Sequence, residues 1–147
     1  MKSTRLILLL AIPLVIAAEP AEEAKKDLEK LQGEWVMAAL EVEGKPVPDE
    51  KIQGTTLTIK GDKYIVSVKD KKHEVTITLD PTKNPKHIDM AFPDGTNAPK
   101  IGKGIYKIEG DKFILCRTQS TDGDRPTQFG TFDNTGLFQV TWQRKMQ

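Results

Sequence analysis

The sequence predicts an all-β protein, an up-and-down antiparallel β-barrel of about eight to nine strands with a short N-terminal helix. From residue 33 onward, apolar and polar residues alternate in short segments, as they do in strands with one buried face. Short turns separate most of these segments, and strands joined in sequence by short turns form a meander. An open meander has two exposed edges, and closure into a barrel removes both.

The alternating segments give the positions of the strands. We expect strands over residues 34–43, 54–60, 63–69, 73–80, 86–92, 103–109, 112–118, 127–133 and 137–144. Two of the turns have a clear signature, because "TIKGDKYIV" and "KIEGDKFIL" each place a Gly-Asp pair between alternating segments. Glycine in the first place of a two-residue loop favours a type II′ hairpin, so residues 60–63 and 109–112 are predicted tight turns.

Residues 1–18 are predicted to be a cleaved export signal. A start with two positive charges leads into an apolar run, and Ala17 and Ala18 supply the small residues of a cleavage zone. We expect cleavage after Ala17 or Ala18, a secreted or periplasmic location and no membrane anchor on the mature protein. An uncleaved anchor is the alternative, although the run is short for crossing a bilayer.

Residues 19–32 form a charged lead-in that is rich in helix formers. Acids come first, bases follow, and Gly33 ends the run, which predicts a partly helical segment. A disordered linker is the alternative for residues 19–24. The barrel itself is expected to span residues 33–147.

Charge and cysteine content narrow the functional classes. Losing Lys2 and Arg5 from 22 basic residues, against 21 acidic residues, leaves the mature chain with a net charge of −1. This balance gives no electrostatic reason to expect a nucleic-acid partner. Cys116 is the only cysteine, so an internal disulfide is impossible, and a buried apolar role is favoured over a reactive thiol. One monomeric domain with one core is expected.

The lengths of the connections predict two unlike ends of the barrel. One end is expected to collect the short connections, at Gly61-Asp62, Pro81 to Pro85, Gly110-Asp111 and Asn134 to Gly136. The other end is expected to collect Gly44 to Gln53, Asp70 to Lys72, Pro93 to Gly102 and Gln119 to Pro126, most of which are long. The barrel would then be a cup with a tight floor and an open rim.

The stretch "GEW" resembles the Gly-x-Trp signature on the first strand of lipocalins and their calycin relatives. The resemblance implies that Gly33 and Trp35 form the barrel floor and that Arg144, from the last strand, packs over the indole. "LQGEW", "EGKPVP", "LDPTKNPKHIDM", "GIYKIEGDKFILC" and "RPTQF" follow one another in that order. Together they resemble the uncharacterised lipocalin-like domains of planctomycete bacteria, which implies a lipocalin-like barrel and no established activity.

The side chains that share the inner face of the strands either fill the barrel or line a ligand cavity. The expected inward residues are Leu57, Ile59, Val75, Ile77, Leu79, Ile88, Met90, Tyr106, Ile108, Phe113 and Leu115. If a cavity exists, the candidate ligand-binding residues are Tyr106, Phe113, Leu115, Arg117 and Arg125. Tyr106 or Arg117 would orient the polar end of a small apolar or amphipathic molecule. Arg117, Arg125 and Lys100 are alternatively solvated charges on the rim.

The sequence offers no catalytic or metal-binding pattern. His73 and His87 are the only histidines, and the pair His87 and Asp89 lacks the further ligands of a zinc site. No nucleophile elbow or phosphate-binding loop is present. We therefore expect no cofactor, no metal and no enzymatic activity. The alternative to ligand binding is a protein-interaction or structural module with a filled core that acts through its rim loops.

Overall fold

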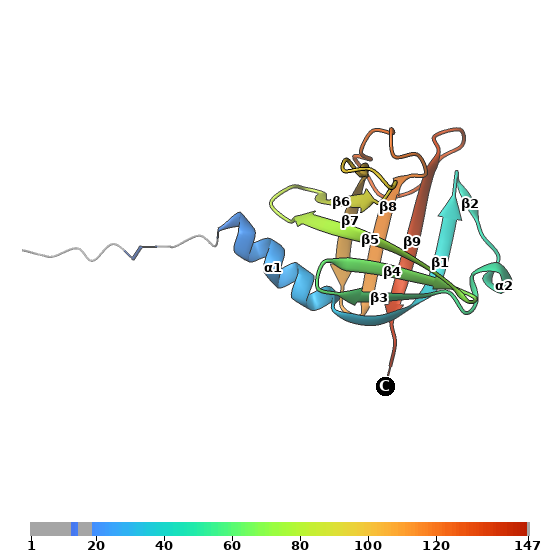
Figure 1. The fold of residues 1–147 in the computed structure, drawn as a ribbon, viewed down its shortest axis with the longest axis horizontal. Helices are drawn as coiled ribbons and strands as arrows, with labels where there is room; N and C mark the ends of the chain where they lie inside the picture. Colours follow the sequence, from blue (N-terminus) through green and yellow to red (C-terminus); the bar gives the residue numbers. More distant parts are fainter. Residues whose placement is uncertain (1–12, 15–18, 147) are drawn as a thin grey trace, which may run out of the picture.

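The computed structural model describes residues 13–14 and 19–146 (Figure 1). Apart from Pro13 and Leu14, the predicted export signal lies outside the described residues. No helix within the described part of the chain has both the length and the apolar composition needed to cross a bilayer.

The chain folds as a short helix followed by a closed antiparallel barrel. The elements are α1 (Pro20–Leu31), β1 (Gly33–Val42), β2 (Lys45–Pro46), α2 (Asp49–Ile52), β3 (Thr56–Lys60), β4 (Lys63–Val68), β5 (Lys71–Asp80), β6 (Lys86–Phe92), β7 (Lys100–Glu109), β8 (Lys112–Thr118) and β9 (Leu137–Arg144). Strands β1 and β3 to β9 pair in sequence order, and β9 pairs with β1 to close the barrel. The short β2 adds to the end of β1. The predicted all-β, up-and-down barrel with an N-terminal helix is therefore confirmed.

The predicted strand over residues 127–133 is wrong, and its absence explains how the barrel closes. The other eight strands form within a few residues of their predicted bounds, so the ring holds an even number of strands. In a meander of alternating strands, an even count lets the last strand run antiparallel to the first. A ninth strand before residues 137–144 would have made that closing pair parallel.

The two Gly-Asp turns form as predicted. Lys60 pairs with Lys63 and Glu109 pairs with Lys112, which leaves two-residue loops. Gly61 and Gly110 have φ angles of 60° and 58°, a region that suits glycine at the first position of such a turn.

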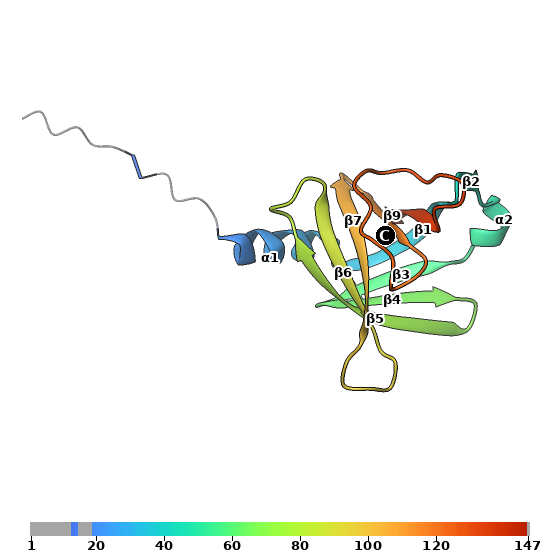
Figure 2. The ribbon, with the colours of Figure 1, turned by 90° about the horizontal axis from the view of Figure 1, so that it is seen from above.

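The barrel has a tight floor and a long-looped rim, with one correction to the expected layout. The floor holds the turns β3–β4, β5–β6 and β7–β8, while the connections β1–β3, β6–β7 and β8–β9 lie at the rim. Residues 134–136 were expected at the floor, but they immediately precede β9, whose first residue pairs with Thr118 at the rim end of β8. The expectation failed because it counted 127–133 as a strand. The β6–β7 loop projects from the barrel (Figure 2).

Residues 119–136 instead fold back over the outside of the barrel wall. The Gly130 backbone N–H donates to the Gln139 side chain at 2.7 Å, and the Thr131 hydroxyl bonds to Glu41. Ile105 and Cys116 face outward from their strands, and both are fully buried. The Cys116 thiol donates to the Gly130 carbonyl at 3.5 Å.

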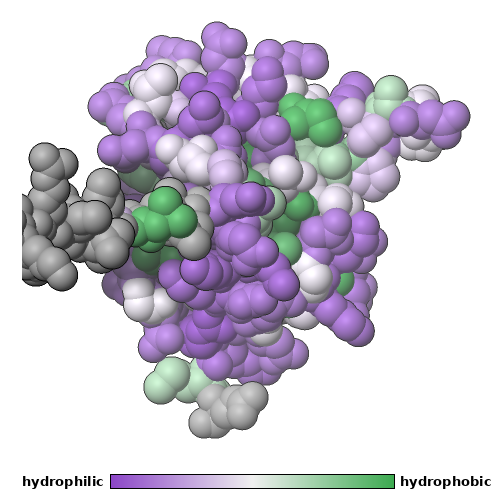
Figure 3. All heavy atoms as spheres, turned by 90° about the vertical axis from the view of Figure 1, so that its left-hand side faces the viewer, coloured by the Kyte–Doolittle hydropathy of each residue, from purple (hydrophilic) through white to green (hydrophobic). Residues whose placement is uncertain are grey.

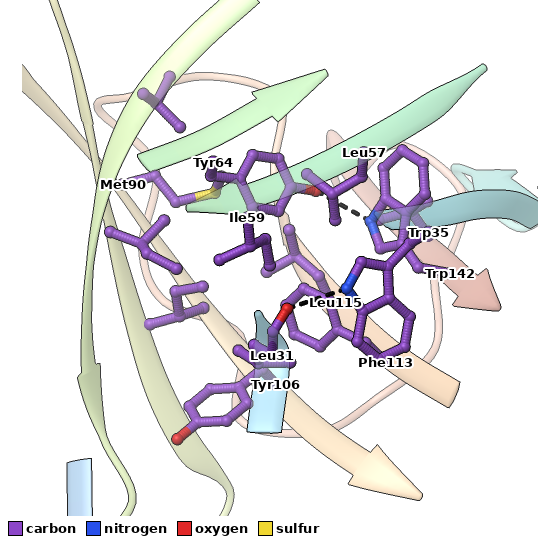
Figure 4. Close-up of a cluster of buried hydrophobic side chains, with 14 of the residues drawn as sticks. Leu31, Trp35, Leu57, Ile59, Tyr64, Met90, Tyr106, Phe113, Leu115 and Trp142 are labelled. Atoms are coloured by element: carbon purple, nitrogen blue, oxygen red, sulfur yellow. Dashed lines mark hydrogen bonds between the residues drawn. The ribbon is translucent and has the colours of Figure 1, made fainter. Parts of the chain in front are cut away.

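Helix α1 closes the floor. Leu31 and Trp35 are both fully buried, and the Trp35 ring nitrogen donates to the Leu31 carbonyl at 2.9 Å (Figure 4). The Arg144 guanidinium carbon lies 4.2 Å from the centroid of the Trp35 ring, as the resemblance implied. Arg144 also donates to the Lys30 and Gln32 carbonyls at 2.5 and 3.0 Å. One arginine therefore holds the end of the helix against the floor indole.

Aromatic rings fill the floor half of the interior. Phe113 makes edge-on contacts with Trp35, Tyr64 and Tyr106, with ring centroids 6.0 to 6.5 Å apart. Such pairs add about 0.5–1.5 kcal/mol each beyond the burial of area. The face of the molecule from which α1 projects is mostly hydrophilic, with only scattered apolar residues (Figure 3). This face therefore presents few apolar side chains to solvent.

Candidate ligand-binding site

The rim half of the barrel is hollow. It contains a cavity of about 410 Å³ with a predominantly apolar wall. The lining residues are Met37, Leu40, Val42, Tyr64, Val66, His73, Val75, Met90, Phe92, Leu115, Arg117, Gln119, Phe138, Val140 and Trp142. The interior is therefore divided: packed side chains occupy the floor half, and a preformed apolar cavity occupies the rim half.

A β-bulge in β1 determines which of its residues face this cavity. Met37 pairs with Trp142, whereas the next pair joins Ala39 to Thr141, so Ala38 is the extra residue. The inserted residue shifts the inward phase of the strand by one position. Leu40 consequently lines the cavity, and Glu41 turns outward to the segment that covers the barrel wall.

Tyr64 and Trp142 form the boundary between the packed half and the hollow half. The Trp142 ring nitrogen donates to the Tyr64 hydroxyl at 2.9 Å, and the two rings meet edge-on (Figure 4). Both side chains are almost fully buried. Burial raises the pKa of Tyr64, so the phenol stays neutral at physiological pH. The bottom of the cavity is thus aromatic and uncharged.

Arg117 brings a positive charge into the cavity wall. Its guanidinium carbon lies 4.9 Å from the Phe92 ring centroid and 4.7 Å from the Phe138 ring centroid. One terminal nitrogen donates to the Thr118 carbonyl at 2.6 Å. Nε is buried and has no hydrogen-bond partner among the described residues. Burial lowers the pKa of Arg117, because the cation loses hydration, but arginine remains charged at pH 7.

Two glycines in β7 make room for Phe92 and Arg117. A Cβ atom at Gly102 would lie 2.8 Å from a Phe92 ring carbon and 3.4 Å from a terminal nitrogen of Arg117. A Cβ atom at Gly104 would lie 3.1 Å from the Arg117 Cβ and 2.9 Å from the Cys116 carbonyl oxygen. The contacts below 3.0 Å, with the Phe92 ring and the Cys116 carbonyl, would force the neighbours to move, and the 3.1 Å contact with the Arg117 Cβ would be tight. The β7 wall therefore contributes backbone, and β6 and β8 contribute the side chains.

Of the five candidate ligand-binding residues, two line the cavity. Leu115 and Arg117 do so from β8. Phe113 lies two residues nearer the floor on the same strand and belongs to the packed core. Tyr106 does not reach the cavity: its hydroxyl donates to the Asp27 carboxylate on α1 at 2.8 Å, inside the floor. Strand alternation correctly placed Tyr106 inside the barrel, but it carries no information on height along the axis.

Arg125 also lies away from the cavity, on the outer wall. It donates to the Ile88 and Gly104 carbonyls at 3.1 and 2.7 Å and to the Asp89 carboxylate at 2.6 Å. These three hydrogen bonds hold Arg125 against β6 and β7. Lys100 is exposed at the start of β7. The expected cluster of three rim cations does not form, and Arg117 alone contacts the cavity.

Several lining residues were not predicted from the sequence. Met37, Leu40, Val42, Val66, Phe92, Phe138, Val140 and Trp142 line the cavity but were not among the expected inward residues. For β1 the bulge conceals the pattern, because Trp35 and Met37 are followed by Leu40 rather than by residue 39. For β9, the alternation of Phe138, Val140 and Trp142 indicates that the three side chains share the inner face of the strand.

Metal ligation has no support within the described residues, where no group of three His, Cys, Asp or Glu side chains is close enough to hold a metal. The Asp89 carboxylate is engaged by Arg125, and His87 shares that outer face. Burial and the charge of Arg125 lower the pKa of His87. His73 lines the cavity at its exposed end.

These features define a class of protein: an eight-stranded, up-and-down barrel that is packed at one end and carries an apolar cavity at the other. No protein-family model, curated protein or solved structure matches the chain.

Proposed function

We propose that this protein binds a small apolar or amphipathic molecule, without catalysis, in the rim half of the barrel. The observation that carries the proposal is the cavity of about 410 Å³ inside an otherwise packed domain. Ligand pockets commonly measure about 300–1,000 Å³ and combine apolar walls with few polar groups. The ligand enters at the rim, between the long connections.

The partial burial of the lining side chains also supports ligand binding. Met37, Leu40, Val66, Phe92 and Phe138 pack against the core yet remain only partly buried. An apolar ligand would cover their remaining surface, which favours binding by about 25 cal/mol per Å² removed from water. The bulge in β1 and the glycines of β7 shape the cavity without a ligand, so little ordering is needed on binding.

The cavity also favours ligand binding over the interaction module considered above. That module requires a core that is filled throughout, and the rim half is hollow. A ligand-binding role accounts for this hollow, whereas a scaffold that acts only through its loops gives it no purpose. We further propose that the chain is exported and belongs with the uncharacterised planctomycete lipocalin-like domains. The apolar residues 6–18 and the floor contact between Trp35 and Arg144 support these assignments.

Cavity binding is tested with N-phenyl-1-naphthylamine, a neutral dye that fluoresces in apolar sites. We expect the protein to bind the dye and the variant Val66→Trp to bind it about tenfold more weakly or worse, because the indole fills part of the cavity. Val36→Trp is the matched control, since Val36 lies on the outward face of β1 and is 36% exposed. It should leave dye affinity unchanged.

Dye binding that is absent in the unmodified protein would contradict the proposal. Equal weakening in Val66→Trp and Val36→Trp would do the same, because the bound dye would then lie elsewhere on the protein.

A further inference from the structure

The charge inside the cavity identifies the chemistry of the ligand's polar end. None of the described residues that line the cavity is an Asp or a Glu, and Arg117 takes part in no ion pair within the described chain. Arg117 is partly buried, and a charge that has lost part of its hydration is costly unless a counter-ion or hydrogen bonds compensate for it. Within residues 13–14 and 19–146, the neighbours of the guanidinium are two aromatic rings and one carbonyl, with no anion.

We propose that the natural ligand is an amphipathic monocarboxylic acid whose carboxylate pairs with Arg117 and whose apolar body fills the cavity. This inference rests on the proposed function and assigns the ligand a chemical class. One positive charge matches one carboxylate, whereas a doubly charged phosphate would bring an excess negative charge into an apolar wall.

The free hydrogen-bonding capacity of Arg117 suits a carboxylate. Phe92 and Phe138 contact the guanidinium, and one terminal nitrogen is committed to the Thr118 carbonyl. The Nε–H has no partner among the described residues. Nε and a terminal nitrogen form the planar fork that binds both oxygens of a carboxylate. The ligand would therefore satisfy the donor that the protein leaves unsatisfied.

The position of Arg117 sets the orientation of the ligand. Thr118, the next residue, is the last of β8 and pairs with Leu137 at the rim, so the guanidinium lies in the upper part of the cavity. Tyr64 and Trp142 form the aromatic lower part. The carboxylate consequently binds near the rim, and the apolar body points toward the floor.

The test compares n-decanoate with n-decanol, which share an apolar chain and differ in the head group. Affinities are measured by displacement of bound N-phenyl-1-naphthylamine at pH 7. We expect the unmodified protein to bind the acid at least about tenfold more tightly than the alcohol, the usual scale of a charge-assisted hydrogen bond. Arg117→Met should abolish this preference while retaining dye binding.

Two further variants test whether the carboxylate pairs with the Arg117 fork or responds only to positive charge near the rim. Lys100→Met removes one positive charge from an exposed position at the rim end of β7, and the preference for the acid should persist in it. Arg117→Lys keeps the charge but lacks the planar fork, so the preference should fall to an intermediate value. Arg117→Met is expected to fold, because an apolar side chain can often replace a partly buried charge that has no ion-pair partner.

The possible failures are distinguishable. If dye, acid and alcohol all fail to bind the unmodified protein, the cavity is not a binding site, and the proposed function falls together with this inference. If acid and alcohol bind equally well, or if Arg117→Met retains the preference, the cavity remains a binding site and the assignment of a carboxylate is wrong.

Discussion

At the scale of single residues, Trp35 combines several stabilising contacts in one side chain. It is fully buried, bonds to the Leu31 carbonyl, contacts Phe113 edge-on and lies under the Arg144 guanidinium. Each of these contacts joins a different segment of the chain to the floor. Trp35 therefore connects α1, β1, β8 and β9.

We expect Trp35→Ala to lower the free energy of unfolding by about 3–5 kcal/mol, because it leaves a cavity and removes these contacts. Urea unfolding followed by circular dichroism gives the measurement. Trp35→Phe should cost less, since it keeps a ring in place and loses only the hydrogen bond and part of the volume. A loss below about 1 kcal/mol in the alanine variant would show that the indole does not support the floor.

At the scale of elements, helix α1 is held to the barrel by an ionic cluster as well as by apolar contacts. The Asp27 carboxylate, 5% exposed, accepts from Lys86 at 2.7 Å and from Tyr106 at 2.8 Å. Burial alone would raise the pKa of Asp27. The hydrogen bonds from Lys86 and Tyr106, with the charges of Lys86 and Lys30, outweigh it and hold the pKa below the usual value of 3.8.

This cluster predicts an acid dependence of stability. A carboxyl whose pKa is lower in the folded than in the unfolded state stabilises the fold above about pH 4, and the contribution is lost as the pH falls through the folded pKa. Asp27→Asn should therefore cost about 1–3 kcal/mol at pH 7, with a smaller difference from the unmodified protein at pH 3. Urea unfolding at both pH values measures it.

Glu29→Gln is the control for this prediction, because it removes an exposed carboxylate from the same helix. It should change the unfolding free energy little at either pH. A difference between Asp27→Asn and the unmodified protein that is the same at pH 3 and pH 7 would mean that the Asp27 charge does not hold the helix.

The sequence predicted the strands well because alternation and turn chemistry are local properties. Both Gly-Asp hairpins, the helix and eight of the nine expected strands are present. Residues 127–133 misled because polar and apolar residues alternate there in the sequence, but Phe129 and Thr131 pack on the outer wall rather than in the sheet. Alternation reports two unlike environments, and it does not identify which wall supplies the buried one.

The site was predicted only in part, since its residues depend on non-local geometry. Alternation placed Leu115 and Arg117 on the inner face, where they line the cavity. Leu40 was missed because a bulge changes the phase within β1, and Arg125 was misplaced because a loop position does not specify the surface onto which the loop folds.

At the scale of the whole molecule, the segment 119–136 makes the barrel wall two layers thick on one side. Ile105, Ile114 and Cys116 are buried but do not belong to the main core, and the Cys116 thiol bonds to the Gly130 carbonyl of this segment. Burial raises the pKa of the Cys116 thiol to about 11. The free thiol therefore reports whether this outer layer stays closed.

We expect the Cys116 thiol in the native protein to react with a disulfide reagent at pH 8 at least about a hundredfold more slowly than in denaturant, because both its thiolate fraction and its access are reduced. The absorbance of the released thiol measures the rate. A native rate within about tenfold of the denatured rate would show that the segment opens readily without unfolding of the barrel.

The floor of the barrel is where the protein can be attached to a support without covering the cavity. Helix α1 leads into β1 at the floor, and β9 ends there as well, where Arg144 pairs with Trp35 (Figure 1). Both ends of the described domain thus lie opposite the mouth of the cavity. A support, a label or a fused domain joined at either end leaves that mouth facing free solution, so the immobilised protein can be screened against ligands without blocking their entry.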